Sequence, residues 1–121
     1  MKYTPYGKLV RKYRIDEGIT LNEMSKDFDV TPAYLSSIET GRKSVPQKIL
    51  EMTLKFFALE DEQEEKLVEA AETSKREYKL KMPMGTPDGD REIASMFARQ
   101  FPGMSDEEKE QLKRLLEGRR L

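Results

Sequence analysis

The sequence predicts an all-α fold, with five helices in residues 1–80 and a helical extension in residues 81–121. Apolar residues recur at helical spacing, and the segments that carry them are bounded by helix-capping and helix-stopping residues. No segment shows the alternation of apolar and polar residues that a half-buried strand requires. Residues 82–89 contain two prolines and two glycines, so they indicate a linker between the two parts.

The first two helices have clear boundaries. Residues 5–17 carry one apolar stripe, and Gly18 directly after them ends the helix. Residues 21–28 form the second predicted helix. It is preceded by Thr20, whose side chain is a good N-cap, and Glu23 three positions later completes a capping box.

The third helix is predicted from Pro32 to Thr40. Thr31 is its N-cap, and proline is tolerated at the first helical position because its missing N–H has no partner there. Gly41 is expected to end the helix in the left-handed conformation.

The next two helices complete the first part of the chain. Ser44 and Gln47 have capping-box spacing, so they predict the start of a fourth helix that continues to Phe57. The acidic residues 61–65 suit the positive end of a helix dipole, and they predict a fifth helix that runs to about Leu80.

Composition excludes several functions. The chain has no histidine and no cysteine, which removes the usual zinc ligands, a cysteine nucleophile and disulfides. Its carboxylates form no recognisable catalytic group, so we expect no enzyme, no metal site and no cofactor. Because the sequence contains no long apolar run and no signal peptide, we expect no membrane association and a cytoplasmic location.

The net charge of −1 conceals an uneven distribution of charge. Residues 1–60 hold ten Lys and Arg against eight Asp and Glu, whereas residues 61–121 hold twelve against fifteen. The basic side chains that could face a nucleic acid are therefore expected in the first half of the chain.

Residues 21–41 contain the most informative spacing, two short helices joined by a turn of about three residues. Ser25 is small enough for close packing, and Asp29 tolerates a left-handed backbone in the turn. This geometry is used to place a helix in the DNA major groove, although the pattern alone also fits an ordinary helical hairpin.

A resemblance favours DNA binding. Arg14, Gly18 and Thr20 follow the pattern R-x-x-x-G-x-T, and residues 30–42 read VTPAYLSSIETGR. These features, with Pro46 opening the fourth helix, resemble the phage repressor and Cro family, also called the Xre family, over residues 5–60. The resemblance implies a five-helix, repressor-like helix-turn-helix domain. Asp29 departs from the family, which usually has glycine there.

The resemblance also implies a set of DNA-binding residues. The groove-facing positions of the recognition helix would be Thr31, Pro32, Ala33, Ser36, Ser37 and Thr40. The positions near phosphates would be Thr20, Leu21, Asn22, Tyr34, Arg42 and Lys43. The groove-facing side chains are short, so the bidentate pairings of Arg, Asn or Gln with bases are missing, and the operator sequence does not follow from the chain. Finally, Arg14 and Glu39 occupy positions that form a structural salt bridge in the family.

The extension is predicted to form two short helices over residues 91–101 and 105–118, the second opened by a capping box of Ser105 and Glu108. Helices this short are unstable alone, so their apolar faces must be buried somewhere. We expect these faces to form a dimer interface or a surface for a protein partner through Phe97, Phe101, Leu112, Leu115 and Leu116.

Two functions remain open from the sequence. The first is a repressor, autoregulatory in some members of the family, that binds palindromic operator DNA as a homodimer. The second is an antitoxin or a peptidase-partnered regulator whose C-terminal half binds a toxin or peptidase protein. The identity of the neighbouring gene would distinguish these two functions most simply.

Overall fold

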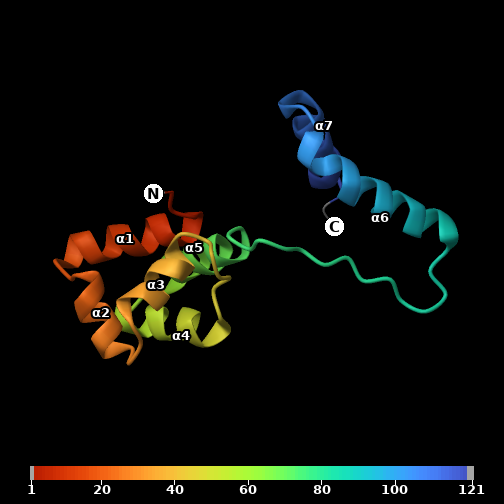
Figure 1. Cartoon of the computed structure of the whole chain (residues 1–121). Coiled ribbons are helices and arrows are strands. Elements are labelled where there is room, and N and C mark those ends of the chain that lie inside the picture. The colour runs from red at the N-terminus through yellow and green to blue at the C-terminus, as the bar shows by residue number, and fades with distance from the viewer. Residues whose placement is uncertain (1, 120–121) are drawn as a thin grey trace. The chain divides into compact units, whose positions relative to one another are not determined.

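In a computed structural model, which describes residues 2–119, the chain is helical throughout and has no strand among the described residues. Figure 1 labels the α-helices along the chain. The elements are α1 (Pro5–Glu17), α2 (Leu21–Asp27), α3 (Pro32–Glu39), α4 (Gln47–Phe56), α5 (Asp61–Glu72), α6 (Asp88–Gln100), the 3₁₀-helix η1 (Phe101–Gly103) and α7 (Asp106–Glu117). The predicted all-α class is confirmed.

The chain divides into two compact units. The N-terminal unit contains α1 to α5 and ends at Tyr78, and the C-terminal unit begins at Lys79 and contains α6, η1 and α7.

Local capping rules account for most helix boundaries of the N-terminal unit. Thr20 and Glu23 form the predicted capping box, and the Thr31 side chain accepts a hydrogen bond from the backbone N–H of Tyr34. The sequence did not identify the N-cap of α1, which is Thr4, with its hydroxyl accepting from Gly7 N at 3.1 Å. These side chains satisfy N–H groups that a helix start leaves without backbone partners.

Two predicted boundaries of the N-terminal unit are wrong, and in the C-terminal unit α6 begins at Asp88, inside the predicted linker, and not at Arg91. Helix α4 has Pro46 as its N-cap, and it has no side-chain cap because the proline ring carries no hydrogen-bond acceptor. Gln47 instead donates a hydrogen bond to Glu51 within the helix. Helix α5 ends at Glu72 and not near Leu80. The reason is that Ser74 leaves the helix and accepts a hydrogen bond from Tyr6 N at 3.0 Å.

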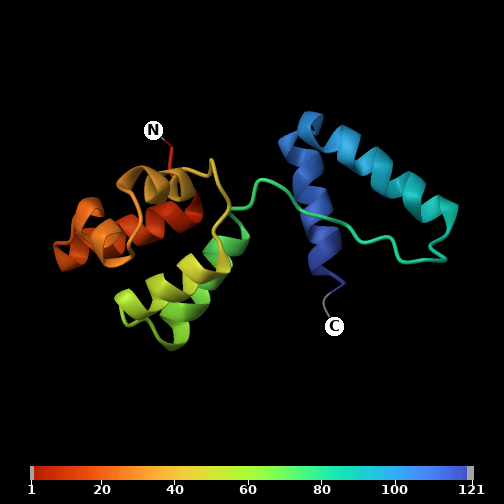
Figure 2. The same cartoon turned by 60° about the horizontal axis from the view of Figure 1, so that its bottom comes forward.

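The core of the N-terminal unit draws on all five helices, which gather around it in Figures 1 and 2. Helix α5 packs against α1 and α4, so the core needs α5 to close. The Tyr6 hydroxyl lies 2.9 Å from the hydroxyl of Thr53, and burial raises the pKa of Tyr6 to about 12. The buried apolar residues are Tyr6, Val10, Met24, Phe28, Leu35, Ile38, Ile49, Leu50, Leu59, Leu67, Ala70 and Ala71.

The C-terminal unit has no comparable core. None of the described residues of α6, η1 or α7 is buried. The single chain does not bury the apolar face of α7, since Leu115 and Leu116 are 62% and 60% exposed. The predicted capping box at the start of α7 is confirmed, because Glu108 N donates to the Ser105 hydroxyl at 3.1 Å.

No helix in the described part of the chain combines the length and apolar character that a membrane span requires.

Candidate DNA-binding surface

The two helices α2 and α3 form a compact hairpin. Ser25 is buried where they approach each other, and its hydroxyl donates to Asn22 O at 2.8 Å. In the turn, Asp29 has φ 54°, which is the left-handed conformation that aspartate can adopt. Val30 N then donates to Ser25 O at 3.0 Å and fixes the start of the path toward α3.

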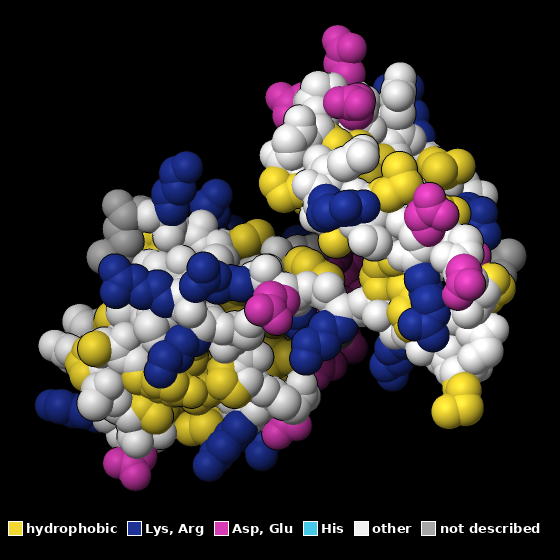
Figure 3. All heavy atoms as spheres, turned by 45° about the vertical axis from the view of Figure 1, so that its right-hand side comes forward, with side chains coloured by type: hydrophobic (Ala, Val, Ile, Leu, Met, Phe, Trp, Pro, Cys, Tyr) yellow, Lys and Arg dark blue, Asp and Glu magenta, His cyan; other side chains and the backbone are white. Residues whose placement is uncertain are grey.

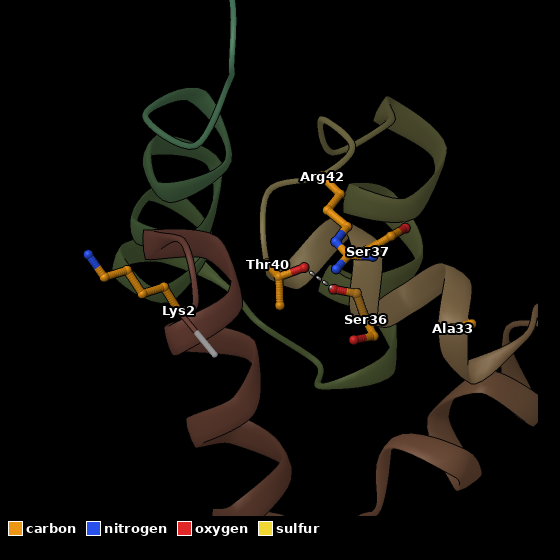
Figure 4. Close-up of a pocket in the computed structure, with 6 residues that line it drawn as sticks. All are labelled: Lys2, Ala33, Ser36, Ser37, Thr40 and Arg42. Atoms are coloured by element: carbon orange, nitrogen blue, oxygen red, sulfur yellow. Dashed lines mark hydrogen bonds between the residues drawn. The ribbon is translucent and has the colours of Figure 1, made fainter.

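The buried side of α3 leaves its other side open. Leu35 and Ile38 are in the core, whereas Ala33 is exposed and Ser36 and Ser37 are half-buried. Figure 4 shows a hollow over this open side, of about 480 Å³. Its lining residues are Lys2, Ala33, Ser36, Ser37, Thr40 and Arg42.

Five of the predicted DNA-binding residues therefore line the same hollow. They are Ala33, Ser36, Ser37, Thr40 and Arg42. The structure adds Lys2, which the sequence did not identify because residues ahead of the first helix carry no periodic signal. In Figure 4, Lys2 and Arg42 lie on opposite sides of Thr40. The hollow is thus floored by short neutral side chains and flanked by two cations.

The hydroxyl groups in the hollow differ in what they can offer. Ser37 donates to Tyr34 O at 2.6 Å, and Thr40 donates to Ser36 O at 2.8 Å. Since a hydroxyl has one proton, these two groups have only lone pairs left for a ligand. The Ser36 hydroxyl makes no hydrogen bond within the described part of the chain, so it can both donate and accept.

Two further predicted residues, Tyr34 and Lys43, are outside the lining of the hollow. Lys43 lies in the exposed loop after α3, and its Nζ sits 5.2 Å from the ring centroid of Tyr34. This cation–π contact places the lysine ammonium over the tyrosine ring. Within the described residues, neither Arg42 nor Lys43 forms a salt bridge, so both charges are available to an anion.

The other predicted residues stand at helix starts. Thr20 is occupied by its capping box, in which Thr20 N donates to Glu23 Oε1 at 3.2 Å. Leu21 and Asn22 form the first turn of α2, and Asn22 is exposed. Thr31 and Pro32 are exposed at the start of α3.

Arg14 and Glu39 form a buried ion pair that joins α1 to the end of α3. Two hydrogen bonds of 2.6 and 2.9 Å link the guanidinium to the carboxylate, and the side chains are only 8% and 5% exposed. The backbone segments that carry the pair also approach closely, since Thr4 N, just before α1, donates to Glu39 O at the end of α3 at 3.0 Å. A Cβ at Gly7 would lie 2.0 Å from that carbonyl oxygen, so only glycine fits there. The pair sets where α3 ends relative to α1.

The predicted interface residues of the C-terminal unit form a partly connected apolar surface. The rings of Phe97 and Phe101 stack with their centroids 5.4 Å apart, and Lys109 Nζ lies 5.1 Å from the Phe101 centroid. Leu112 is half-buried, while Leu115 and Leu116 are exposed. Figure 3 shows apolar side chains open to solvent among the charged ones on this unit.

A comparison with protein families identifies the fold. Residues 10–60 match a family model described as helix-turn-helix. The N-terminal unit is therefore a helix-turn-helix domain, and the chain is a DNA-binding transcriptional regulator. This match confirms the predicted resemblance of these residues to the Xre, or phage repressor and Cro-like, family. Neither curated proteins nor solved structures gave a match.

Proposed function

We propose that the protein is a sequence-specific repressor that binds palindromic operator DNA as a homodimer. The observation that carries this proposal is the hollow over the open side of α3, where short polar side chains lie between the cations Lys2 and Arg42. A recognition helix in the major groove needs a face that approaches base edges and cations that meet the flanking phosphates. Footprinting of the DNA upstream of the gene is the direct test, and a protected inverted repeat is the expected result.

Each part of the surface has its own role in this proposal. Ser36, Ser37 and Thr40 face base edges, with Ala33 near enough for apolar contact to a thymine methyl group. Arg42 and Lys43 contact phosphates, and Tyr34 contacts the sugar-phosphate backbone beside Lys43. Thr20, Leu21 and Asn22 bring the first turn of α2 close to a phosphate, and Thr31 and Pro32 enter the groove first.

The exposed apolar faces of α6 and α7 support dimerisation. Phe97 and Phe101 are 40% and 42% exposed in the single chain, and such surfaces are usually covered by a partner. A second copy fits the palindromic operator, since half-sites about 34 Å apart need two linked recognition helices. The second candidate function, an antitoxin or peptidase-partnered regulator, places another protein on the same faces. Sedimentation of the purified chain alone separates the two, because only the first gives a dimer.

Removing the loop cations should weaken binding to every DNA sequence alike. For Arg42→Ala with Lys43→Ala, the slope of log K against log salt should become less negative by about 1.8, at about 0.9 for each phosphate that is no longer neutralised. The measurement is a salt titration of binding to specific and random duplexes. A matched control removes two exposed lysines from α4 and α5, Lys55→Ala with Lys66→Ala, and should leave the slope unchanged. An unchanged slope in the test variant would remove Arg42 and Lys43 from the residues that bind phosphates.

Replacing Ser37 should weaken binding to the preferred operator and leave binding to other sequences nearly unchanged. Its hydroxyl proton is donated to Tyr34 O, so toward DNA it offers lone pairs that suit an amino group of adenine or cytosine. Ser37→Ala should therefore lose about 1 kcal/mol on the preferred operator and little on a variant that lacks the amino group. Ser95→Ala on the exposed surface of α6 is the control. If every operator variant weakened equally, Ser37 would not be reading bases.

A further inference from the structure

A second hollow continues the basic surface beyond the helix-turn-helix. It has a volume of about 390 Å³ and is lined by Arg42, Ser44, Arg76 and Glu77. Arg42 lines both hollows, so the space over α3 and the space beside Arg76 meet at this one side chain. Arg76 belongs to the turn after α5, far along the chain from the recognition helix.

The turn that carries Arg76 is fixed to the body of the N-terminal unit. Ser74 is buried, where its hydroxyl accepts from Tyr6 N at 3.0 Å and donates to Ala70 O at 2.5 Å. Farther along, the Tyr78 hydroxyl donates to Glu72 O at 2.8 Å, which folds the turn back on the end of α5. Arg76 lies between these two attachments, so its position beside Arg42 is set by the fold.

The charges in this second hollow are not balanced internally. Arg42 and Arg76 converge on it, and neither forms a salt bridge within the described residues. Glu77 supplies one carboxylate against two guanidinium groups. An anion between the arginines would remove their mutual repulsion, and arginine pairs with phosphate oxygens through two parallel hydrogen bonds. The Ser44 hydroxyl is a further donor on the same lining.

We propose that Arg76 contacts a DNA phosphate next to the one held by Arg42. The DNA-binding surface then has three segments, which are the residues before α1, the helix-turn-helix with its following loop, and the turn after α5. This inference rests on the proposed function, because it assigns one more contact to the same DNA. The phosphates of a duplex follow one another along the groove edge, so a backbone that passes Arg42 continues over the second hollow.

A salt titration of DNA binding by the full-length chain tests the contact. Arg76→Ala should make the slope of log K against log salt less negative by about 0.9, with sequence preference unchanged. Between about 50 and about 200 mM salt, the ratio of wild-type to variant affinity should then fall about 3.5-fold. Arg76→Lys keeps the charge and should keep the wild-type slope. Glu77→Gln removes the carboxylate and should raise affinity on all sequences.

The outcomes separate this inference from the proposed function. A wild-type slope in Arg76→Ala, with a reduced slope in the Arg42 and Lys43 double variant, would overturn the Arg76 contact alone. A wild-type protein that binds no DNA would overturn the proposed function instead. Thermal melts of Arg76→Ala and Arg76→Lys check the fold. If the alanine and lysine variants lost the same affinity, the effect would not come from charge and the contact would be rejected.

Discussion

Replacing Glu39 with alanine should lower the free energy of unfolding of the N-terminal unit by about 3 kcal/mol. The change leaves the Arg14 guanidinium buried with no carboxylate, and its one other hydrogen bond within the described residues is a long one of 3.8 Å to Met24 Sδ. In a domain of this size each kcal/mol moves the melting temperature by about 4–8 °C, so a fall of about 12–24 °C is expected. Circular dichroism of both proteins during heating measures it.

The side chain of Glu39 can be tested separately from its backbone. The backbone carbonyl accepts hydrogen bonds from Thr4 N and Thr4 Oγ1 at 3.0 and 3.1 Å, and alanine keeps both. The double variant Arg14→Met with Glu39→Leu removes both charges and should lose much less stability than Glu39→Ala, because no charge stays buried alone. Glu72→Ala, which breaks the exposed pair with Lys75, should cost under about 1 kcal/mol. A melt unmoved by Glu39→Ala would contradict the buried-pair interpretation.

Local rules predicted the parts of the fold that depend on neighbours in the chain. The capping box of Thr20 and Glu23 needs only residues three positions apart, and the left-handed turn at Asp29 needs only a residue that tolerates it. The early end of α5 could not be predicted in this way. It depends on the hydrogen bond between Ser74 and Tyr6, whose proximity exists only after α1 and α5 have packed together.

The residues of the candidate site also fall into two groups, those that the sequence predicted and those that only tertiary packing brings together. Ala33, Ser36 and Ser37 of α3 and its C-cap Thr40 line one hollow, and the family resemblance was what implied them as a group. Lys2 and Arg76 join that surface from the two ends of the N-terminal unit. Their sequence surroundings carry no motif, and their nearness to Arg42 is a result of tertiary packing.

Truncating the chain after Leu80 should leave a folded N-terminal unit that binds operator DNA about 100-fold more weakly, or weaker still. The unit should fold because its core is complete within α1 to α5 and no buried residue lies beyond Ser74 in the described part of the chain. Affinity should fall because two linked half-site contacts become one, and linkage alone multiplies affinity by about 10² to 10⁴. The truncated chain retains Arg76, so the proposed phosphate contacts stay intact.

The interface can also be tested in the full-length chain. Phe101→Glu with Leu116→Glu places charges on the exposed faces of η1 and α7, which contribute nothing to the core of the N-terminal unit. This variant should sediment as a monomer and lose operator affinity as the truncation does, while its affinity for a single half-site stays unchanged. Ser95→Ala on α6 should remain dimeric.

A truncated chain that is still a dimer with undiminished operator affinity would place the interface within residues 1–80. A full-length chain that is monomeric on its own, and yet is held by a second protein through Phe101 and Leu116, would assign these helices to the partner-binding function.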